Sequence, residues 1–543
     1  MWSIECHGAG AHLRVDFACM GSDLQVAARS VMSANPATGA VLREFPVACD
    51  SEVYAAVERA RAAQPGWQDV RVQDRIRVLK KFQQLLHARA TDIAKVITSE
   101  AGKPLVEALL TEVLVVLDAA RFCTENVRQF LCDQPLSHGN LAMKTKVGRI
   151  VREPYGVIGI ISPWNYPFSI PATETIAALA TGNAVVLKPS ELTSLCALEF
   201  ASLMHEAGVP KDVFLVVVGD GGTGAALSTA KIDKLVFTGS VPTGKRIAQA
   251  AASRLLPLVL ELGGKDPMIV LDDADIDIAS SGAVWGGFVN AGQTCLSVER
   301  CYVHRSLYDR FLNACVQKTE QLRVGNGLDE GIEVGPLIHE RQLRAVEAQV
   351  EEARSRGARV LAGGRRLPEQ GPNFYAPTVL ADVTHEMSVM REETFGPVLP
   401  VMAFDSDEQA IALANDSEFG LGASVWTRNR RRGSSMARRI HAGIGMVNDT
   451  VSCFGISEAP HGGVKSSGLG RTHGRFGLEE MVRIKYLSDD RLPGMKKIWW
   501  YGYGDSMRPQ MEGFLDLMFA RSWSRRLRGG MRSAAALTRK GRI

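Results

Sequence analysis

The sequence predicts an α/β protein in which short parallel strands alternate with helices. Five apolar runs rich in Val and Ile lie at 157–161, 184–187, 213–218, 234–237 and 257–260. Helical stretches of roughly ten to fifteen residues separate them, which is typical of repeated strand–helix–strand units and a parallel sheet. The chain has 543 residues, too many for one small domain, so two or three lobes are expected.

The composition is that of an ordinary globular enzyme. Apolar residues make up 46% and charged residues 22% of the chain, and the net charge of +4 gives no reason to expect a nucleic-acid partner. The ten cysteines are irregularly spaced, so we expect no disulfide framework and a cytoplasmic, reducing location. No run of eighteen apolar residues predicts a spanning helix. Residues 1–30 lack a signal-peptide pattern and are expected to form a poorly ordered leader.

Helical periodicity precedes the strands. Apolar residues recur at three- and four-residue steps from Ser51, and we expect that helix to end at Pro65-Gly66. Further helices are expected at 72–89, 91–100 and 106–130. We assign their apolar stripes to core packing.

Three short motifs supply reactive side chains. Cys295 ends Gly292-Gln293-Thr294-Cys295, and a single cysteine is more often a buried small hydrophobe than a nucleophile. Upstream, however, Glu261 ends an apolar strand just before two glycines, and Asn165 lies in the rigid turn Pro163–Pro167. A thiol, a carboxylate and an amide donor are the groups needed for covalent attack on a carbonyl.

A phosphate-binding element is expected at 238–245. Gly239 and Gly244 allow close approach of a pyrophosphate to the start of a helix, where negative charge is favoured. The Gly-x4-Gly-Lys spacing is that of a nucleotide-triphosphate loop, but Arg246 stands where that pattern needs Ser or Thr. We therefore reject the triphosphate interpretation.

Six motifs occur in one order along the chain: PWNYPF, FTGS with a glycine four residues on, LELGGK, GQTC, EETFGPV and SSGLGR. In this order they resemble the NAD(P)-dependent aldehyde dehydrogenase superfamily, from about Ser33 to about Leu487. The resemblance implies two parallel-sheet Rossmann-type lobes plus a small β oligomerisation segment. It also implies that Cys295 is the nucleophile, that Glu261 is the base and that Asn165 stabilises the oxyanion.

The same resemblance implies a bound NAD, with NADP as the alternative and no metal. A carboxylate at Glu191 would repel the 2′-phosphate of NADP, which favours NAD. The implied cofactor-binding residues are Ser162, Trp164, Lys188, Ser190, Glu191, Gly221, Gly239, Ser240, Gly244, Leu262, Glu393 and Phe395. The implied aldehyde tunnel contains Tyr166, Ile170, Thr173, Leu296 and Phe454. We assign no catalytic role to His461, which replaces the usual Phe of the family.

The expected reaction is oxidation of an aldehyde to a carboxylic acid through a thiohemiacetal and a thioester. An apolar tunnel favours aliphatic or aromatic aldehydes; a succinate-semialdehyde dehydrogenase and a membrane-associated fatty aldehyde dehydrogenase are the alternatives. An enzyme that transfers the acyl group to coenzyme A is disfavoured because Glu261 would activate water. A scaffold on an inactive enzyme fold is disfavoured because Cys295, Glu261 and Asn165 are all present.

The expected domain organisation follows the motifs. Residues 31–142 and 155–261 are assigned to the NAD-binding domain and 262–448 to the catalytic domain. Residues 143–154 and 449–490 are assigned to bridging segments that pair subunits into a homodimer or homotetramer. Residues 491–543 form a basic-aromatic extension with seven arginines, one lysine and no acid from Arg521 onward. We favour a solvated, partly disordered tail with an aromatic latch at 499–501, and the alternative is weak contact with anionic lipid.

Overall fold

The computed structural model describes residues 29–140, 143–497, 499–505 and 507–538, with the side chains of 535–538 excepted. The chain divides into two compact units, and the first contains residues 1–132 and 152–484. The second unit contains residues 133–151 and 485–543. The predicted leader lies almost entirely outside the described residues.

The five predicted strands form one sheet of the first unit, which confirms the α/β prediction. In spatial order the strands are β17 (Gly468–Leu469), β9 (Leu258–Glu261), β8 (Lys234–Thr238), β5 (Val157–Ile161), β6 (Ala184–Lys188) and β7 (Phe214–Val216). Only β17 runs antiparallel to its neighbour. The residues of β5 and β6 are buried throughout, as expected for strands that are covered on both faces.

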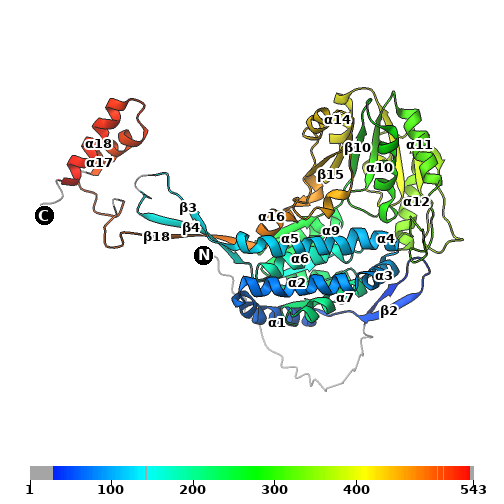
Figure 1. Cartoon of the computed structure of the whole chain (residues 1–543), viewed down its shortest axis with the longest axis horizontal. Helices are drawn as coiled ribbons and strands as arrows, with labels where there is room; N and C mark the ends of the chain where they lie inside the picture. Colours follow the sequence, from blue (N-terminus) through cyan, green and yellow to red (C-terminus); the bar gives the residue numbers. More distant parts are fainter. Residues whose placement is uncertain (1–28, 141–142, 498, 506, 539–543) are drawn as a thin grey trace, which may run out of the picture. The chain divides into compact units, whose positions relative to one another are not determined.

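Helices cover this sheet and bury their apolar faces against it. They include α1 (Asp50–Asp69), α2 (Val72–Ala88), α3 (Ala90–Ala101), α5 (Leu114–Leu131), α6 (Ser169–Ala180), α7 (Ser194–Ala207), α8 (Gly221–Thr229) and α9 (Val241–Ala252). Figure 1 shows α2, α5 and α6 running alongside one another. The helices predicted at 72–89 and 91–100 are confirmed, and the one predicted at 106–130 is α4 (Leu105–Ala108) and α5 joined by a π-helical turn, Leu109–Val113.

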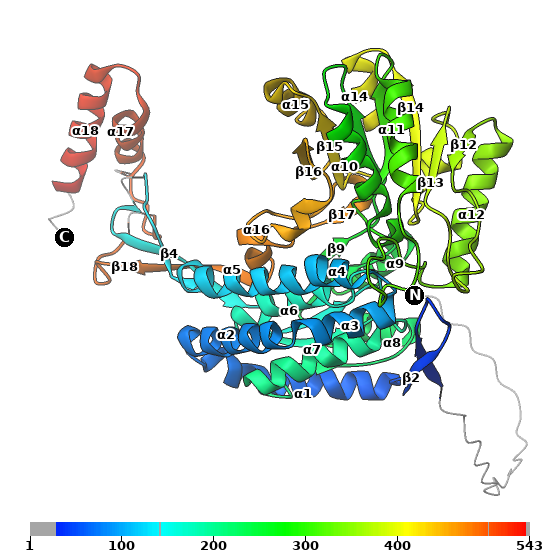
Figure 2. The ribbon, with the colours of Figure 1, turned by 45° about the vertical axis from the view of Figure 1, so that its right-hand side comes forward.

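A second sheet carries the other lobe of the first unit. Its strands, in spatial order, are β12 (Arg359–Ala362), β13 (Thr378–Ala381), β14 (Val398–Phe404), β11 (Val298–His304), β10 (Asp266–Val270), β15 (Gly422–Trp426) and β16 (Ile444–Val447). All pair in parallel except β12 with β13. Its helices include α10 (Ile276–Phe288), α11 (Tyr308–Glu320), α12 (Glu340–Ser355), α14 (Asp407–Asn415) and α15 (Arg430–Ala437), seen more openly in Figure 2.

The prediction that Pro65-Gly66 ends the first helix is wrong. Helix α1 continues to Asp69 with Pro65 inside it. A proline in a helix interior removes one backbone hydrogen bond. Here buried side chains anchor the helix on both sides of it: the Gln64 amide donates to the Gly182 carbonyl at 3.0 Å, and the Trp67 indole donates to the Leu179 carbonyl at 3.0 Å.

The second unit contains a three-stranded sheet, in which β3 and β4 are antiparallel, and a helical hairpin. Strands β4 (Lys146–Pro154) and β18 (Val482–Asp490) lie within the segments 143–154 and 449–490 that the sequence analysis assigns to bridging, and β3 (Gln134–Leu136) is added to them. The expectation of a partly disordered tail is wrong for α17 (Met507–Phe519) and α18 (Trp523–Thr538). No helix in the described part of the chain is long and apolar enough to cross a membrane.

Candidate active site

The Cys295 loop is held in an unusual backbone conformation. It follows the short helix Val289–Gly292, in which Asn290 and Ala291 both have φ of 54° and Gly292 has φ of 72°. A Cβ on Gly292 would lie 2.1 Å from the Gly396 carbonyl oxygen, and one on Gly264 would lie 2.2 Å from the Cys295 carbonyl oxygen. The two glycines therefore allow the loop to pack directly onto neighbouring backbone. The Cys295 side chain remains partly accessible.

Asn165 approaches this loop from the turn that follows β5. Its side-chain amide donates a hydrogen bond to the Gln293 carbonyl at 3.0 Å, two residues before Cys295. Its own carbonyl accepts from the Lys103 ammonium at 2.8 Å and from the Asn290 amide at 2.9 Å. The amide predicted to stabilise an oxyanion is thereby fixed beside the thiol loop.

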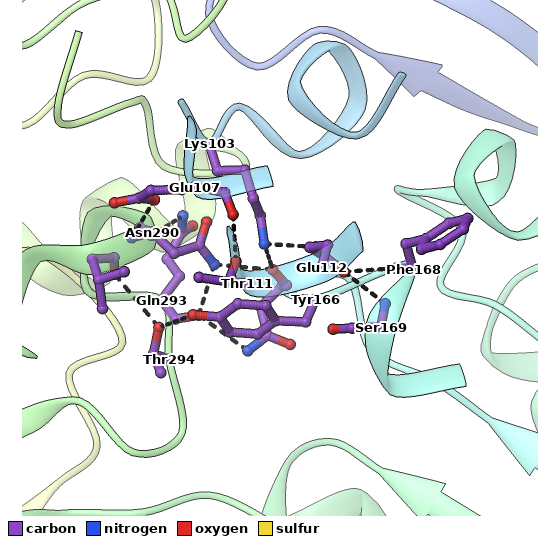
Figure 3. Close-up of polar contacts among 12 residues, drawn as sticks. Lys103, Glu107, Thr111, Glu112, Tyr166, Phe168, Ser169, Asn290, Gln293 and Thr294 are labelled. Atoms are coloured by element: carbon purple, nitrogen blue, oxygen red, sulfur yellow. Dashed lines mark hydrogen bonds and ion pairs between the residues drawn. The ribbon is translucent and has the colours of Figure 1, made fainter. Parts of the chain in front are cut away.

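A buried ion pair supports this turn (Figure 3). The Lys103 ammonium donates to the Glu112 carboxylate at 2.7 Å, and both side chains are fully buried. Glu112 also accepts from the backbone N–H groups of Phe168 and Ser169, at 3.1 and 2.7 Å, where α6 begins. A carboxylate at a helix N-terminus is favoured by the unpaired N–H groups there. The ion pair thus holds Asn165 and the start of α6 in one arrangement.

Glu261 stands at the carboxyl end of β9 with no hydrogen-bond partner on either carboxylate oxygen. Burial, with a further contribution from Glu174, raises the pKa of Glu261 well above its ordinary value. His461 Nε2 lies 3.8 Å from Glu261 Oε2, too far for a hydrogen bond. Burial lowers the pKa of His461 to about 3, so the imidazole is neutral and does not form an ion pair with the carboxylate.

A small cavity lies beside Glu174, the carboxylate that contributes to the raised pKa of Glu261. It has a volume of about 30 Å³, and its lining includes Thr173, Glu174, Ser457, Thr472 and His473. One water needs roughly 10–15 Å³ of such space, so two waters fit. Glu174 Oε2, Ser457 Oγ and His473 Nε2 are buried and have no hydrogen-bond partner in the protein. Burial raises the pKa of Glu174 to about 8 and lowers that of His473 to about 4.

The predicted cofactor residues gather mainly at the carboxyl ends of the first sheet. Ser162 follows β5, and its hydroxyl is buried without a partner. Lys188 ends β6 and pairs with Glu191 at 3.4 Å, and Ser190 lies between them. Gly239 follows β8, and Ser240 is the residue before α9 and makes no side-chain capping bond. A Cβ on Gly244 would lie 2.6 Å from Leu262. Gly221 opens α8.

Glu393, Phe395 and Trp164 form a second group. The Gly264 N–H donates to Glu393 at 2.9 Å, and burial raises the pKa of Glu393. The Phe395 and Trp164 rings lie 5.3 Å apart, edge to face.

A buried ion pair fixes the loop that carries Phe395. Lys265 and Glu299 lie 2.7 Å apart, and Glu299 accepts from the N–H groups of Thr394 and Phe395 at 2.8 and 2.9 Å. The pair therefore holds two consecutive N–H groups of the 392–397 loop.

The predicted tunnel residues divide between two places. Leu296 packs in an apolar cluster against which Cys295 and Phe454 also lie. The Tyr166 ring is 6.4 Å from Phe454, and its hydroxyl is 2.8 Å from that of Thr294. Ile170 and Thr173 are buried in α6, but the Thr173 hydroxyl donates to the Ile170 carbonyl, and Thr173 lines the small cavity instead.

Sequence reasoning missed several residues that shape the site: Lys103, Glu112, Glu174, Lys265, Glu299 and His473. Lys265 and Glu299 lie inside the motif segments around Glu261 and Cys295, so their neighbourhood was a usable signal. Lys103 lies in the short link between α3 and α4, and Glu112 lies in the π-helical turn, and in the sequence both resemble ordinary surface charge. Only the folded chain brings them to Asn165.

Two parallel-sheet lobes, with a partly accessible thiol on the loop before β11 of the second lobe, are the architecture of an α/β enzyme. The sequence profile of the Aldehyde dehydrogenase family matches residues 25–487. The chain belongs to this family.

Individual relatives agree. A 4,4'-diapolycopene aldehyde oxidase of Methylomonas sp is 38% identical over 492 residues, 90% of this chain and 91% of that protein. The NADP(+) succinate-semialdehyde dehydrogenase GabD of Escherichia coli (strain K12) is 38% identical over 455 residues, 83% of this chain and 93% of that protein. The crystal structure of an NAD-dependent aldehyde dehydrogenase from Sinorhizobium meliloti is similar with a TM-score of 0.83 and 37% identity, over 87% of this chain and 93% of that one.

Proposed function

We propose that this enzyme oxidises an aldehyde to a carboxylic acid with NAD, through a thiohemiacetal and then a thioester on Cys295. The observation that carries the proposal is the grouping of three side chains: the partly accessible Cys295 thiol, the Asn165 amide that is hydrogen-bonded to the Cys295 loop, and the unpaired Glu261 carboxylate. Burial raises the pKa of the Cys295 thiol, and the nearby carboxylates of Asp266, Glu393 and Glu261 raise it further.

The chemistry assigns one task to each group. The Cys295 sulfur bonds to the aldehyde carbon, and the thiol proton passes to Glu261. The Asn165 amide and the Cys295 N–H donate hydrogen bonds to the oxygen that becomes negative. Before the second step, Glu261 releases the thiol proton to solvent. After the hydride has passed to its acceptor, a water oxygen attacks the thioester carbon while Glu261 takes one water proton. The carbon–sulfur bond then breaks, the Cys295 thiolate takes that proton back, and the carboxylic acid leaves.

The residues present fit a dinucleotide. The buried Ser162 hydroxyl without a partner and the start of α9 at Ser240 without a side-chain cap offer unsatisfied hydrogen-bonding groups. Ser162, Lys188, Glu191, Glu393 and the α9 N-terminus are the groups that would hold it. When bound, NAD supplies the hydride acceptor. Glu191 disfavours a 2′-phosphate, while the NADP(+) in the name of one relative keeps NADP as the second choice.

The preferred substrate is an apolar aldehyde, aliphatic or aromatic. The thiol lies against a cluster built by Val289, Leu296, Leu421, Val451 and Cys453, and Phe454 packs against the same cluster. Such a lining favours a hydrocarbon chain over a second carboxylate. The name of the Methylomonas relative refers to an aldehyde of a long polyene, which agrees with this choice. Succinate semialdehyde and fatty aldehydes are the alternatives.

Absorbance of NADH during turnover of an aldehyde chain-length series, with and without coenzyme A, tests the reaction. We expect acid production without coenzyme A and kcat/KM rising with chain length. Cys295→Ala should abolish turnover while NAD binding persists. Cys132→Ala, which removes an exposed thiol, is the matched control and should stay active. Turnover by Cys295→Ala within about tenfold of the parent excludes the thiol mechanism.

We further propose the domain roles expected from the sequence. Residues 31–142 and 155–261 bind NAD, residues 262–448 carry the thiol loop, and residues 143–154 and 449–490 bridge subunits of a homodimer or homotetramer. The exposed apolar side chains of β18, Ile484 and Tyr486, support the subunit contact. Sedimentation of the full chain distinguishes monomer, dimer and tetramer.

A further inference from the structure

The C-terminal hairpin, which we define as α17 and α18, is packed through backbone and polar groups (Figures 1 and 2). A Cβ on Gly513 would lie 2.8 Å from the Gly529 carbonyl oxygen, and one on Gly529 would lie 2.5 Å from the Gly513 carbonyl oxygen. The Ser533 hydroxyl donates to the Gln510 carbonyl at 3.1 Å. Small residues therefore bring the two helices together, and the large apolar side chains are not needed between them.

Those large side chains are instead exposed. In α18, Trp523, Leu527 and Met531 follow one another at four-residue steps and expose 73%, 49% and 61% of their surfaces. Residues four apart share one face of a helix. In α17, Leu515 and Phe519 are exposed at the same spacing. Leaving apolar area of this size in water is unfavourable, which indicates a partner surface.

The other side of α18 is basic. Arg525, Arg528 and Arg532 are exposed and lie away from the Trp523 stripe, and no Asp or Glu occurs in α18. The two acidic residues of α17 are Asp516, which pairs with Arg525 at 2.8 Å, and Glu512, which pairs with Arg508. Neither of these ion pairs includes Arg528 or Arg532 of α18. The sequence adds Arg539, Lys540 and Arg542, which lie outside the described residues.

We propose that the C-terminal hairpin docks on an anionic phospholipid surface, with the Trp523–Leu527–Met531 stripe in the headgroup region and the arginines on lipid phosphates. An apolar stripe beside a strongly cationic face is the arrangement of helices that lie in a membrane interface. A polybasic segment is attracted to anionic lipid by about 1 kcal/mol per basic residue near the surface. Helix α18 has 16 residues, is about 24 Å long and contains several arginines. These properties suit a helix that lies on a membrane surface rather than one that spans the membrane.

The aromatic latch at 499–501 that the sequence favours stays a prediction. Trp500, Tyr501 and Tyr503 are exposed, Tyr501 by 87%. Within the second unit Trp499 lies near Lys146, whose ammonium is 5.8 Å from the ring centroid. Exposed aromatics next to the hairpin suit a headgroup region, where such rings are enriched. The docking proposal is independent of the reaction proposed above.

Co-sedimentation of the full chain with vesicles tests the docking. Phosphatidylcholine vesicles containing phosphatidylserine should bind it, and binding should fall as salt rises from about 0.01 to 0.5 M, because the Debye length shrinks. Vesicles of phosphatidylcholine alone should bind it weakly. Arg528→Gln with Arg532→Gln should weaken partition about 30-fold, which is two contributions of about 1 kcal/mol.

A second variant tests the apolar stripe. Trp523→Ala with Leu527→Ala and Met531→Ala should weaken partition at least about tenfold, since three apolar side chains leave the interface. Leu255→Ala, which truncates the 88%-exposed Leu255 outside the hairpin, is the control and should bind as the parent does. Circular dichroism of the variants checks that the helices persist.

Three results would overturn the proposal. In the first, full-length protein does not bind anionic vesicles at low salt, and in the second it binds neutral and anionic vesicles equally. In the third, the stripe variant changes the sedimentation mass of the protein without changing vesicle binding, which would make the hairpin a contact between subunits.

Discussion

Four buried carboxylates of the first unit fall into two groups that differ in their hydrogen bonds. Glu112 and Glu299 each accept from one buried lysine ammonium at 2.7 Å and from two consecutive backbone N–H groups. Glu261 has no hydrogen-bond partner on either oxygen, and Glu174 has only the Thr238 hydroxyl at 3.3 Å. A buried charge is tolerated when it is paired, whereas an unpaired acid tends to stay protonated.

This difference distinguishes carboxylates that hold loops in place from carboxylates that are suited to proton transfer. The paired carboxylates hold loops, one at Asn165 and one at Phe395, so their loss should cost stability. The unpaired carboxylates have free oxygens and raised pKa values, which suits groups that take and release protons. The predictions below test that division, from the largest expected effect to the smallest.

Breaking a paired group should cost the most stability. Lys103→Met leaves the Glu112 carboxylate buried without its cation, which should lower the free energy of unfolding by about 3–5 kcal/mol. Denaturant titration measures it. Lys80→Met removes an exposed lysine of α2 and should change the free energy by less than about 0.5 kcal/mol. If both variants lost the same free energy of unfolding, the buried ion pair would stabilise the protein no more than an exposed lysine does.

Removing the unpaired base should cost rate rather than stability. Glu261→Gln should lower kcat by roughly 10²–10³-fold, because an amide cannot take the water proton, and a burst of NADH should precede slow turnover. The melting temperature should stay the same or rise. Glu299→Gln should do the reverse: a lower melting temperature and a higher KM for NAD. A normal kcat in Glu261→Gln would exclude it as the base.

Glu174 should affect stability in a pH-dependent way. Its pKa is about 8 in the folded protein, above the ordinary 4.5, so the folded state keeps a proton that the unfolded state releases. That contribution to stability is complete below about pH 4.5 and is lost as the pH rises through 8. Glu174→Gln should therefore gain melting temperature relative to the parent between pH 5 and 9. A difference that is constant with pH would contradict the raised pKa.

The smallest effect is expected at a partly exposed pair. Glu191 lies 3.4 Å from Lys188 with its side chain 46% exposed. Glu191→Gln should leave the melting temperature unchanged and improve kcat/KM for NADP relative to NAD by about fivefold, since one repulsion of a 2′-phosphate is removed. Steady-state kinetics with both cofactors measures the ratio. If the ratio of kcat/KM for NADP to that for NAD did not change, residues other than Glu191 would select the cofactor.

Local patterns were enough to find the strands and to select the three side chains that we propose to react. The strands at 157–161 and 234–237 are short Val- and Ile-rich runs, and burial on both faces of a parallel sheet requires that composition. Glu261 and Asn165 follow such strands directly, so their placement at the carboxyl edge follows from strand direction alone. The end of α1 could not be found this way, because contacts of Gln64 and Trp67 with residues 112 or more positions away offset the effect of Pro65.

The sequence by itself determined the alternation of strands and helices and the family resemblance, and it led to the proposal of Cys295, Glu261 and Asn165 as the reactive set, because each rests on neighbours within a few residues. Only the tertiary structure decided which carboxylates are paired. Glu112 meets the start of α6 across 56 residues, and Glu299 meets the Phe395 loop across 96. A charge in a helical segment looks the same in sequence whether it is solvated or buried, and the pairing that distinguishes the two depends on contacts between distant segments.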